Sequence, residues 1–228
     1  MKYSWLVFDA DNTLLDFNRS AGIALTETLQ SMDIIPEKAI VDLYHKINLE
    51  CWGDLEAGRI TPAELKLLRF SRFLDQLGAA GDPEQLNAYY FDVLRRSTYL
   101  LDGARDVLEK LGHLGVPMAI ATNGLAEVQH HRLAKAGIVP FFQEIIVSEE
   151  IGYFKPNPGF FHTTAERLQV DEKDPVLMIG DSLRSDIAGA QHMGWDTCWF
   201  NPNKEDQSLP VAPDFTIGQL DELLEILS

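Results

Sequence analysis

Near the N-terminus, a short apolar run, Trp5 to Phe8, ends abruptly in the polar segment Asp9 to Thr13. A run of this length bounded by small and polar residues is typical of a buried parallel strand that leads into a loop. We therefore predict a buried strand here. Its carboxyl end would carry two aspartates, Asp9 and Asp11.

The stretch from Asn18 to Ser97 has a helical pattern instead. Its apolar residues recur at helical spacing, as in Ile23, Leu25, Leu29 and Met32. Two helix starts are explicit. Thr61-Pro62-Ala63-Glu64 combines an N-cap, a proline in the first turn and an acid at the third helical position, and Asp82-Pro83-Glu84 begins another helix. We predict that this stretch is a helical insertion.

After Gly103 the pattern alternates between helix and strand. The predicted strands are Val116 to Ala121, Glu144 to Val147, Val176 to Ile179 and Thr197 to Phe200. The predicted helices are Ala104 to Leu114, Leu125 to Ala136, Gly159 to Leu168, Ser185 to Met193 and, after a surface loop from Asn201 to Pro213, Gly218 to Leu227. Repeated βα units of this kind build an open parallel sheet with helices on both faces.

The predicted fold class is therefore α/β. A Rossmann-like parallel-sheet core would comprise residues 1–16 and 99–228, and an inserted α-helical domain would comprise residues 17–98. In such a sheet, ligands bind outside the carboxyl ends of the strands, where the strand order reverses.

Charge and composition narrow the possible partners. The 228 residues carry a formal charge of −16, which would repel a nucleic-acid polymer or an anionic membrane. The sequence lacks a signal-peptide pattern and any apolar stretch long enough to span a bilayer. Its two cysteines, Cys51 and Cys198, are far apart and predict reduced thiols. We expect a cytoplasmic monomer or homodimer.

Polar residues follow the first four predicted strands of the core. They are Asp9 and Asp11, Thr122-Asn123-Gly124, Lys155-Pro156, and Gly180-Asp181 with Asp186. Any one of them has an ordinary structural role as a turn former, a helix cap or a surface residue. Together they place four carboxylates, a hydroxyl and an ammonium group at one edge of the sheet, which predicts a functional site.

The charge of this cluster indicates a metal ion. Four carboxylates and one lysine leave a formal excess of negative charge, which requires protons or a cation to relieve it. Carboxylate oxygens are ligands that suit Mg²⁺, which commonly also binds waters and a substrate phosphate oxygen. We predict Mg²⁺ as the cofactor.

These motifs resemble those of the phosphatases of the haloacid dehalogenase (HAD) superfamily. Those enzymes carry Asp-x-Asp-x-Thr, a Thr or Ser after the second strand, a Lys, and Gly-Asp followed by another Asp. Here the matching residues are Asp9 to Thr13, Thr122, Lys155, Gly180-Asp181 and Asp186. The helical insertion resembles the small C1-type α-helical cap of that superfamily, so the resemblance covers essentially the whole chain.

The resemblance implies a role for each reacting residue. Asp9 resembles the nucleophile that forms an aspartyl-phosphate, and Asp11 resembles the general acid and base. Thr122 and Lys155 resemble the residues that hold the transferring phosphoryl oxygens.

The resemblance also implies the metal ligands. Asp181 resembles a direct Mg²⁺ ligand, together with Asp9 and the backbone carbonyl of Asp11. Asp186 would bind the metal through water or orient Lys155.

Two loops near the motifs add to this expectation. Asn123 and Gly124 supply backbone N–H groups near a helix N-terminus, which is a favourable place for a phosphate. The position before Thr13 is often Gly in the superfamily and is Asn12 here. Because Asn tolerates the left-handed conformation, we expect the turn to be preserved.

The residues favour one reaction among those of the superfamily. The dehalogenases resemble Asp-x-Tyr at the first motif, whereas Asp11 favours phosphate esters, whose leaving alkoxide needs a proton. A phosphoglucomutase-like phosphotransferase remains an alternative because it shares the core chemistry. A non-enzymatic binding module would be expected to have lost one of Asp9, Asp11, Lys155 or Asp181, and all four are present.

The substrate is predicted by resemblance alone. The segment Leu14 to Phe17, the Thr-Asn-Gly sequence and the overall length resemble the pyrimidine 5′-nucleotidase branch, which implies a nucleoside 5′-monophosphate. Phosphoglycolate or another small phosphate ester is the alternative. Three aromatic residues in or beside the cap are candidates to stack on a base, and ordinary helix packing is the alternative for each: Phe17, Tyr44 and Trp52.

Overall fold

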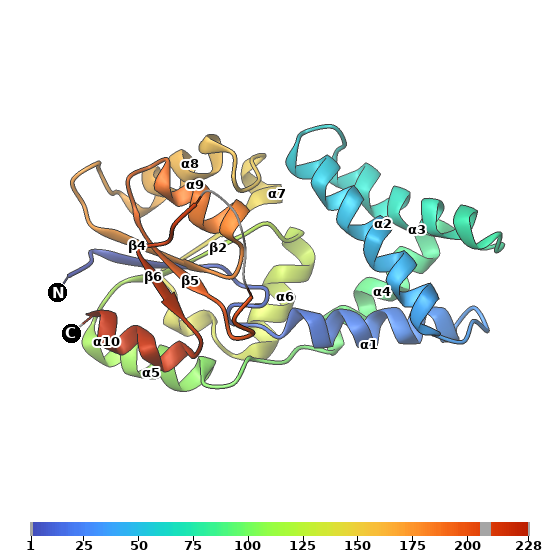
Figure 1. Cartoon of the computed structure of the whole chain (residues 1–228), viewed down its shortest axis with the longest axis horizontal. Coiled ribbons are helices and arrows are strands. Elements are labelled where there is room, and N and C mark those ends of the chain that lie inside the picture. Colours follow the sequence, from blue (N-terminus) through green and yellow to red (C-terminus); the bar gives the residue numbers. More distant parts are fainter. Residues whose placement is uncertain (1, 206–210, 228) are drawn as a thin grey trace. The chain divides into compact units, whose positions relative to one another are not determined.

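The structure, a computed structural model, describes residues 2–205 and 211–227. These residues divide into two compact units, one within Met1–Phe17 and Tyr99–Ser228 and the other Asn18–Thr98. The first unit contains the sheet, and the second is helical (Figure 1). None of the described helices is both long and apolar enough to cross a membrane.

The sheet of the first unit has six described strands in the order β3-β2-β1-β4-β5-β6. Every neighbouring pair is parallel. The strands are β1 (Trp5–Phe8), β2 (Met118–Thr122), β3 (Glu144–Val147), β4 (Val176–Gly180), β5 (Asp196–Phe200) and β6 (Phe215–Ile217). Strand order reverses around β1, because the chain runs outward from it in both directions, so loops after β1, β2 and β4 meet at one crevice.

Helices cover both faces of this sheet, as predicted (Figure 1). Alternate side chains of β1 point to opposite faces. Leu6 and Phe8 pack with buried residues of α5 (Ala104–Leu114), α6 (Ala126–Ala136) and α10 (Leu223–Leu227). Val7 packs with buried residues of α8 (Pro158–Leu168) and α9 (Ala188–Gln191) on the other face. A strand buried on both faces explains why Trp5 to Phe8 is a continuous apolar run.

The structure differs from the prediction at several short elements. The helix predicted from Ser185 to Met193 is a π-helical turn, η2 (Leu183–Ile187), followed by the short α9. Strand β6 and helix α7 (Ser148–Ile151) were not predicted, because each is too short to show a period. The helix predicted from Gly218 to Leu227 begins as a 3₁₀ turn, η3 (Leu220–Glu222). The predicted loop from Asn201 to Pro213 lies partly outside the described residues.

The second unit is built from helices, as the apolar spacing predicted. These are α1 (Phe17–Gln30), whose first residue belongs to the first unit, α2 (Lys38–Glu56), α3 (Pro62–Leu77) and α4 (Pro83–Arg96). The capping box of α3 forms between Thr61 and Glu64, and the Asp82 side chain caps α4.

The first unit also contains a short 3₁₀ turn, η1 (Val139–Phe141). Both cysteines are buried, unpaired thiols.

Candidate active site

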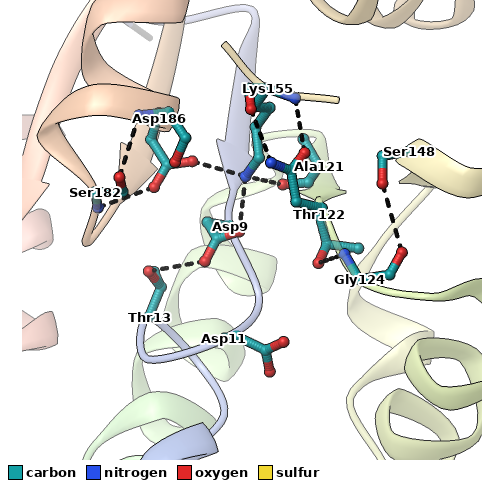
Figure 2. Close-up of polar contacts among 12 residues, drawn as sticks. Asp9, Asp11, Thr13, Ala121, Thr122, Gly124, Ser148, Lys155, Ser182 and Asp186 are labelled. Carbon is teal, nitrogen blue, oxygen red and sulfur yellow. Dashed lines mark hydrogen bonds and ion pairs between the residues drawn. The ribbon is translucent and has the colours of Figure 1, made fainter. Parts of the chain in front are cut away.

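Lys155 lies at the centre of the site and joins three segments of the core. Its ammonium nitrogen lies 2.7 Å from Asp9 Oδ1, 2.7 Å from Asp186 Oδ1 and 2.6 Å from the Ala121 carbonyl oxygen (Figure 2). An ammonium group has three N–H donors, so these contacts use all of them. The side chain is only 1% exposed. Lys155 therefore fixes the loop after β1 against the ends of β2 and η2.

The backbone of Lys155 is held by the side chain of Asn123. The Asn123 Nδ2 atom donates to the Lys155 carbonyl oxygen at 2.8 Å, and the Lys155 N–H donates to Asn123 Oδ1 at 2.7 Å. This double contact uses both ends of the amide. The Asn123 side chain thus positions the segment that carries the lysine, which is a different contribution from the backbone N–H predicted for phosphate binding.

Asp186 is held in place by the turn that carries it. One carboxylate oxygen, Oδ1, contacts Lys155, and the other, Oδ2, accepts from the Ser182 N–H at 3.0 Å. A Cβ atom at Gly180 would collide with this carboxylate, so only glycine fits at the end of β4. The glycine of the Gly-Asp motif therefore makes room for Asp186.

Three carboxylates gather where a metal ion would fit. Asp9, Asp181 and Asp186 each place an oxygen within 4.8 Å of the others. Burial raises the pKa of Asp9 to about 7, against the opposing effect of Lys155 and together with repulsion from Asp186. Burial, followed by the charges of Asp9 and Asp186, raises the pKa of Asp181 to about 8. One lysine does not balance the cluster, and carboxylate oxygens suit Mg²⁺, so these residues fit the predicted metal.

The raised pKa values predict a cost of ionisation in the metal-free protein. A carboxyl group whose pKa rises on folding binds its proton more tightly in the folded state, so stability falls as pH rises from the unfolded to the folded pKa. Asp181 rises from 3.8 to about 8. Asp181→Asn should therefore melt several degrees above the wild type at pH about 8 in chelator, and the difference should vanish near pH 4.

Thermal denaturation of the two proteins in chelator at several pH values measures this difference. Asp106→Asn is the matched control, because Asp106 is an exposed carboxylate on α5. A wild-type protein that is as stable as Asp181→Asn at every pH would contradict the explanation.

Among the described residues, Thr122 Oγ1 accepts hydrogen bonds but donates none. Thr122 Oγ1 accepts from the Gly124 N–H at 3.2 Å and from Gln129 Nε2 at 2.8 Å. A hydroxyl has two acceptor sites and one proton, so both acceptor sites are used and the proton points elsewhere. The Gly124 N–H, predicted to bind phosphate, is directed at this hydroxyl.

Asp11 lies in a tight turn after β1, apart from the Lys155 cluster. Its Oδ1 atom accepts from Arg132 Nη1 at 2.5 Å, and its Oδ2 atom accepts from Gln129 Nε2 at 3.1 Å. The next residue, Asn12, has φ 60°, so the predicted left-handed turn is present. The Thr13 hydroxyl group donates to Asp9 Oδ2, with 3.4 Å between the two oxygens.

The structure thus brings the predicted residues together at the sheet edge, with two additions and one exclusion. Gln129 and Arg132 on α6 were missed, although a glutamine and an arginine one turn apart, just after Thr122-Asn123-Gly124, are a signal in retrospect. Tyr44 is 1% exposed and packs on Phe70, Phe73 and Tyr90 within the helical unit. It is therefore a core residue of that unit and is not available to stack on a base.

Comparison with known proteins identifies the family. The haloacid dehalogenase-like hydrolase family profile matches residues 3–194. The pyrimidine 5′-nucleotidase PynA of Streptococcus pneumoniae is 35% identical over 227 residues, covering 100% of this chain and 96% of PynA. The pyrimidine 5′-nucleotidase YjjG of Escherichia coli is 31% identical, with 100% of this chain and 99% of YjjG covered.

One solved structure is also similar to this chain over its whole length. The putative HAD-hydrolase YfnB from Bacillus subtilis, bound to magnesium, has a TM-score of 0.90 and 35% identity, and the match covers 100% of both chains. The chain belongs to the haloacid dehalogenase-like hydrolase family. The superfamily predicted from the four motifs is confirmed.

Proposed function

We propose that this protein is a Mg²⁺-dependent phosphatase of nucleoside 5′-monophosphates, with a preference for pyrimidines, and that it acts through an aspartyl-phosphate on Asp9. The observation that carries the reaction type is the second carboxylate, Asp11, held in the loop that begins at Asp9. Two full-length relatives named pyrimidine 5′-nucleotidases support the substrate class.

The first step transfers the phosphoryl group to Asp9. A carboxylate oxygen of Asp9 attacks phosphorus, and the bond to the ester oxygen breaks. Asp11 gives its proton to that oxygen, because an alkoxide is a poor leaving group. The free proton of the Thr122 hydroxyl group binds a phosphoryl oxygen, and the buried charge of Lys155 stabilises the negative charge of the transferring group.

The second step hydrolyses the aspartyl-phosphate. Asp11, now ionised, takes a proton from water, and the oxygen of that water attacks phosphorus and releases Asp9. The same group acts as acid and then as base, so the cycle closes with Asp11 protonated again.

Asp9, Asp181 and the Asp11 backbone carbonyl would hold Mg²⁺ in this proposal. The two carboxylate oxygens of Asp186 already have partners: Oδ1 contacts Lys155, and Oδ2 accepts from the Ser182 N–H. These contacts favour an orienting role for Asp186. When bound, Mg²⁺ would neutralise the negative charge of the substrate phosphate, which otherwise is repelled by the acidic site.

A substrate panel tests the proposed function. Phosphate release is measured in Mg²⁺ with UMP, dUMP, dTMP, GMP, phosphoglycolate and a hexose phosphate. We expect kcat/KM to be at least about tenfold higher for the pyrimidine nucleotides than for the other esters, a difference that pocket contacts readily supply. A higher value for phosphoglycolate, or isomerisation of the hexose phosphate without phosphate release, would replace the nucleotidase by one of the two alternatives.

A further inference from the structure

Arg132 is a buried charge whose contacts do not satisfy it. Its side chain is 0% exposed, and its Nη1 atom donates to Asp11 Oδ1 and to Gln129 Oε1. Its Nε and Nη2 atoms are buried and have no hydrogen-bond acceptor among the described residues. The desolvation of these two donors is not compensated by a hydrogen bond, which reduces what the ion pair with Asp11 contributes to folding stability. The arginine is therefore better explained by its effect on Asp11.

Gln129, one turn before Arg132 on α6, completes the contacts to Asp11. Its amide nitrogen donates to Asp11 Oδ2 and to Thr122 Oγ1, and its amide oxygen accepts from Arg132. Both oxygens of Asp11 are thus held by α6. The same amide nitrogen ties Asp11 to the hydroxyl that the proposed function places on the phosphoryl group.

Two neighbours keep this pair in position. A Cβ atom at Gly124 would collide with the Gln129 side chain, so the glycine leaves the space that the glutamine occupies. Gly124 does not have a positive φ, so its backbone conformation does not require glycine. Glycine is required there because the Gln129 side chain occupies the space that a Cβ atom would need. The Arg132 guanidinium lies over the Phe17 ring, 5.4 Å from its centroid, which restrains the guanidinium plane.

We propose that Gln129 and Arg132 are positioning residues for proton transfer: they hold the Asp11 carboxyl group at a fixed place relative to Thr122, so that it meets the leaving-group oxygen. The proposal rests on the proposed role of Asp11 as general acid. It is independent of which phosphate ester is the natural substrate.

A series of substituted phenyl phosphates tests the proposal, because their leaving groups range from nitrophenolate, which leaves without a proton, to phenolate, which benefits from one. The variants are Arg132→Met, Gln129→Ala and Gly124→Ala. We expect kcat/KM for phenyl phosphate to fall by about 10- to 100-fold and that for 4-nitrophenyl phosphate by less than about threefold. The plot of log kcat/KM against leaving-group pKa should steepen in all three variants.

The ratio kcat/KM reports the steps up to phosphorylation, so the later role of Asp11 as base does not enter. Arg132→Lys, which keeps a charge but not the planar fork, should recover part of the loss. Arg167→Met, which removes an exposed arginine from α8, is the matched control and should keep the wild-type slope. The melting temperature of Arg132→Met is measured alongside the kinetics, because this substitution removes the unsatisfied Nε and Nη2 donors and also leaves the Asp11 carboxylate without its ion-pair partner.

The outcomes separate the possible explanations. An equal fall of kcat/KM across the series, with a lower melting temperature, would show a structural role and overturn the proposal. A rise in KM alone, equal for all esters, would show that Arg132 binds phosphate and would also overturn it. A wild-type protein that hydrolyses none of the esters would defeat the proposed function itself, whereas unchanged slopes in an active enzyme would defeat only this inference.

Discussion

Asp9→Asn is expected to lose more than about a thousandfold in kcat for both UMP and 4-nitrophenyl phosphate while remaining folded. The substitution replaces the attacking oxygen by an amide but keeps the shape of the side chain. Because burial raises the pKa of Asp9 to about 7, the neutral amide relieves a cost of ionisation there. Steady-state phosphate release, together with a thermal melt, measures both parts of the expectation.

Asp106→Asn again controls for the loss of a carboxylate, and it should keep wild-type kcat. A folded Asp9→Asn protein with near-normal Mg²⁺-dependent activity would show that another group attacks phosphorus. A variant that loses activity only because it unfolds would be recognised from the melt, and Asp9→Glu, which keeps the charge but moves the oxygens, then serves as the second variant.

Removal of the metal is expected to have the next largest effect. With excess chelator, kcat/KM should fall by more than about a hundredfold, because the substrate phosphate would meet three carboxylates, of which Lys155 contacts two. Adding Mg²⁺ beyond the chelator should restore the activity. A titration of activity against free Mg²⁺ measures the requirement.

Asp181→Asn tests which residues hold the ion. It should need at least about tenfold more free Mg²⁺ for half-maximal activity, since it loses one anionic ligand, and Asp106→Asn should need no more than the wild type. Full activity of the wild type in excess chelator would rule out the metal requirement.

The parts of the fold that follow from local chemistry could be predicted from the sequence. The continuous apolar run of β1 predicted a strand buried on both faces, and the Thr61 capping box predicted the start of α3. The π-helical turn η2 could not be predicted, because the apolar pattern does not show an extra residue in one helical turn. Strand β6 is a three-residue edge strand, too short for a period.

The predicted site residues follow strands, where the topology of a parallel sheet brings them together. Gln129 and Arg132 lie inside a helix instead. The spacing of apolar residues does not show which polar side chains of a helix are buried. The part played by Asn123 was also hidden, since its amide contacts the backbone of Lys155, which is distant in sequence. Contacts of this kind depend on the folded chain.

The aspartyl-phosphate on Asp9 can be trapped and located directly. Asp11→Asn should still accept a phosphoryl group from 4-nitrophenyl phosphate, whose leaving group needs no proton, but should hydrolyse the aspartyl-phosphate slowly. Acid quenching, digestion and tandem mass spectrometry should then find one phosphoryl group on Asp9, and none in the Asp9→Asn, Asp11→Asn double variant. A burst of nitrophenolate without any label on Asp9, or with the label on another residue, would contradict the account.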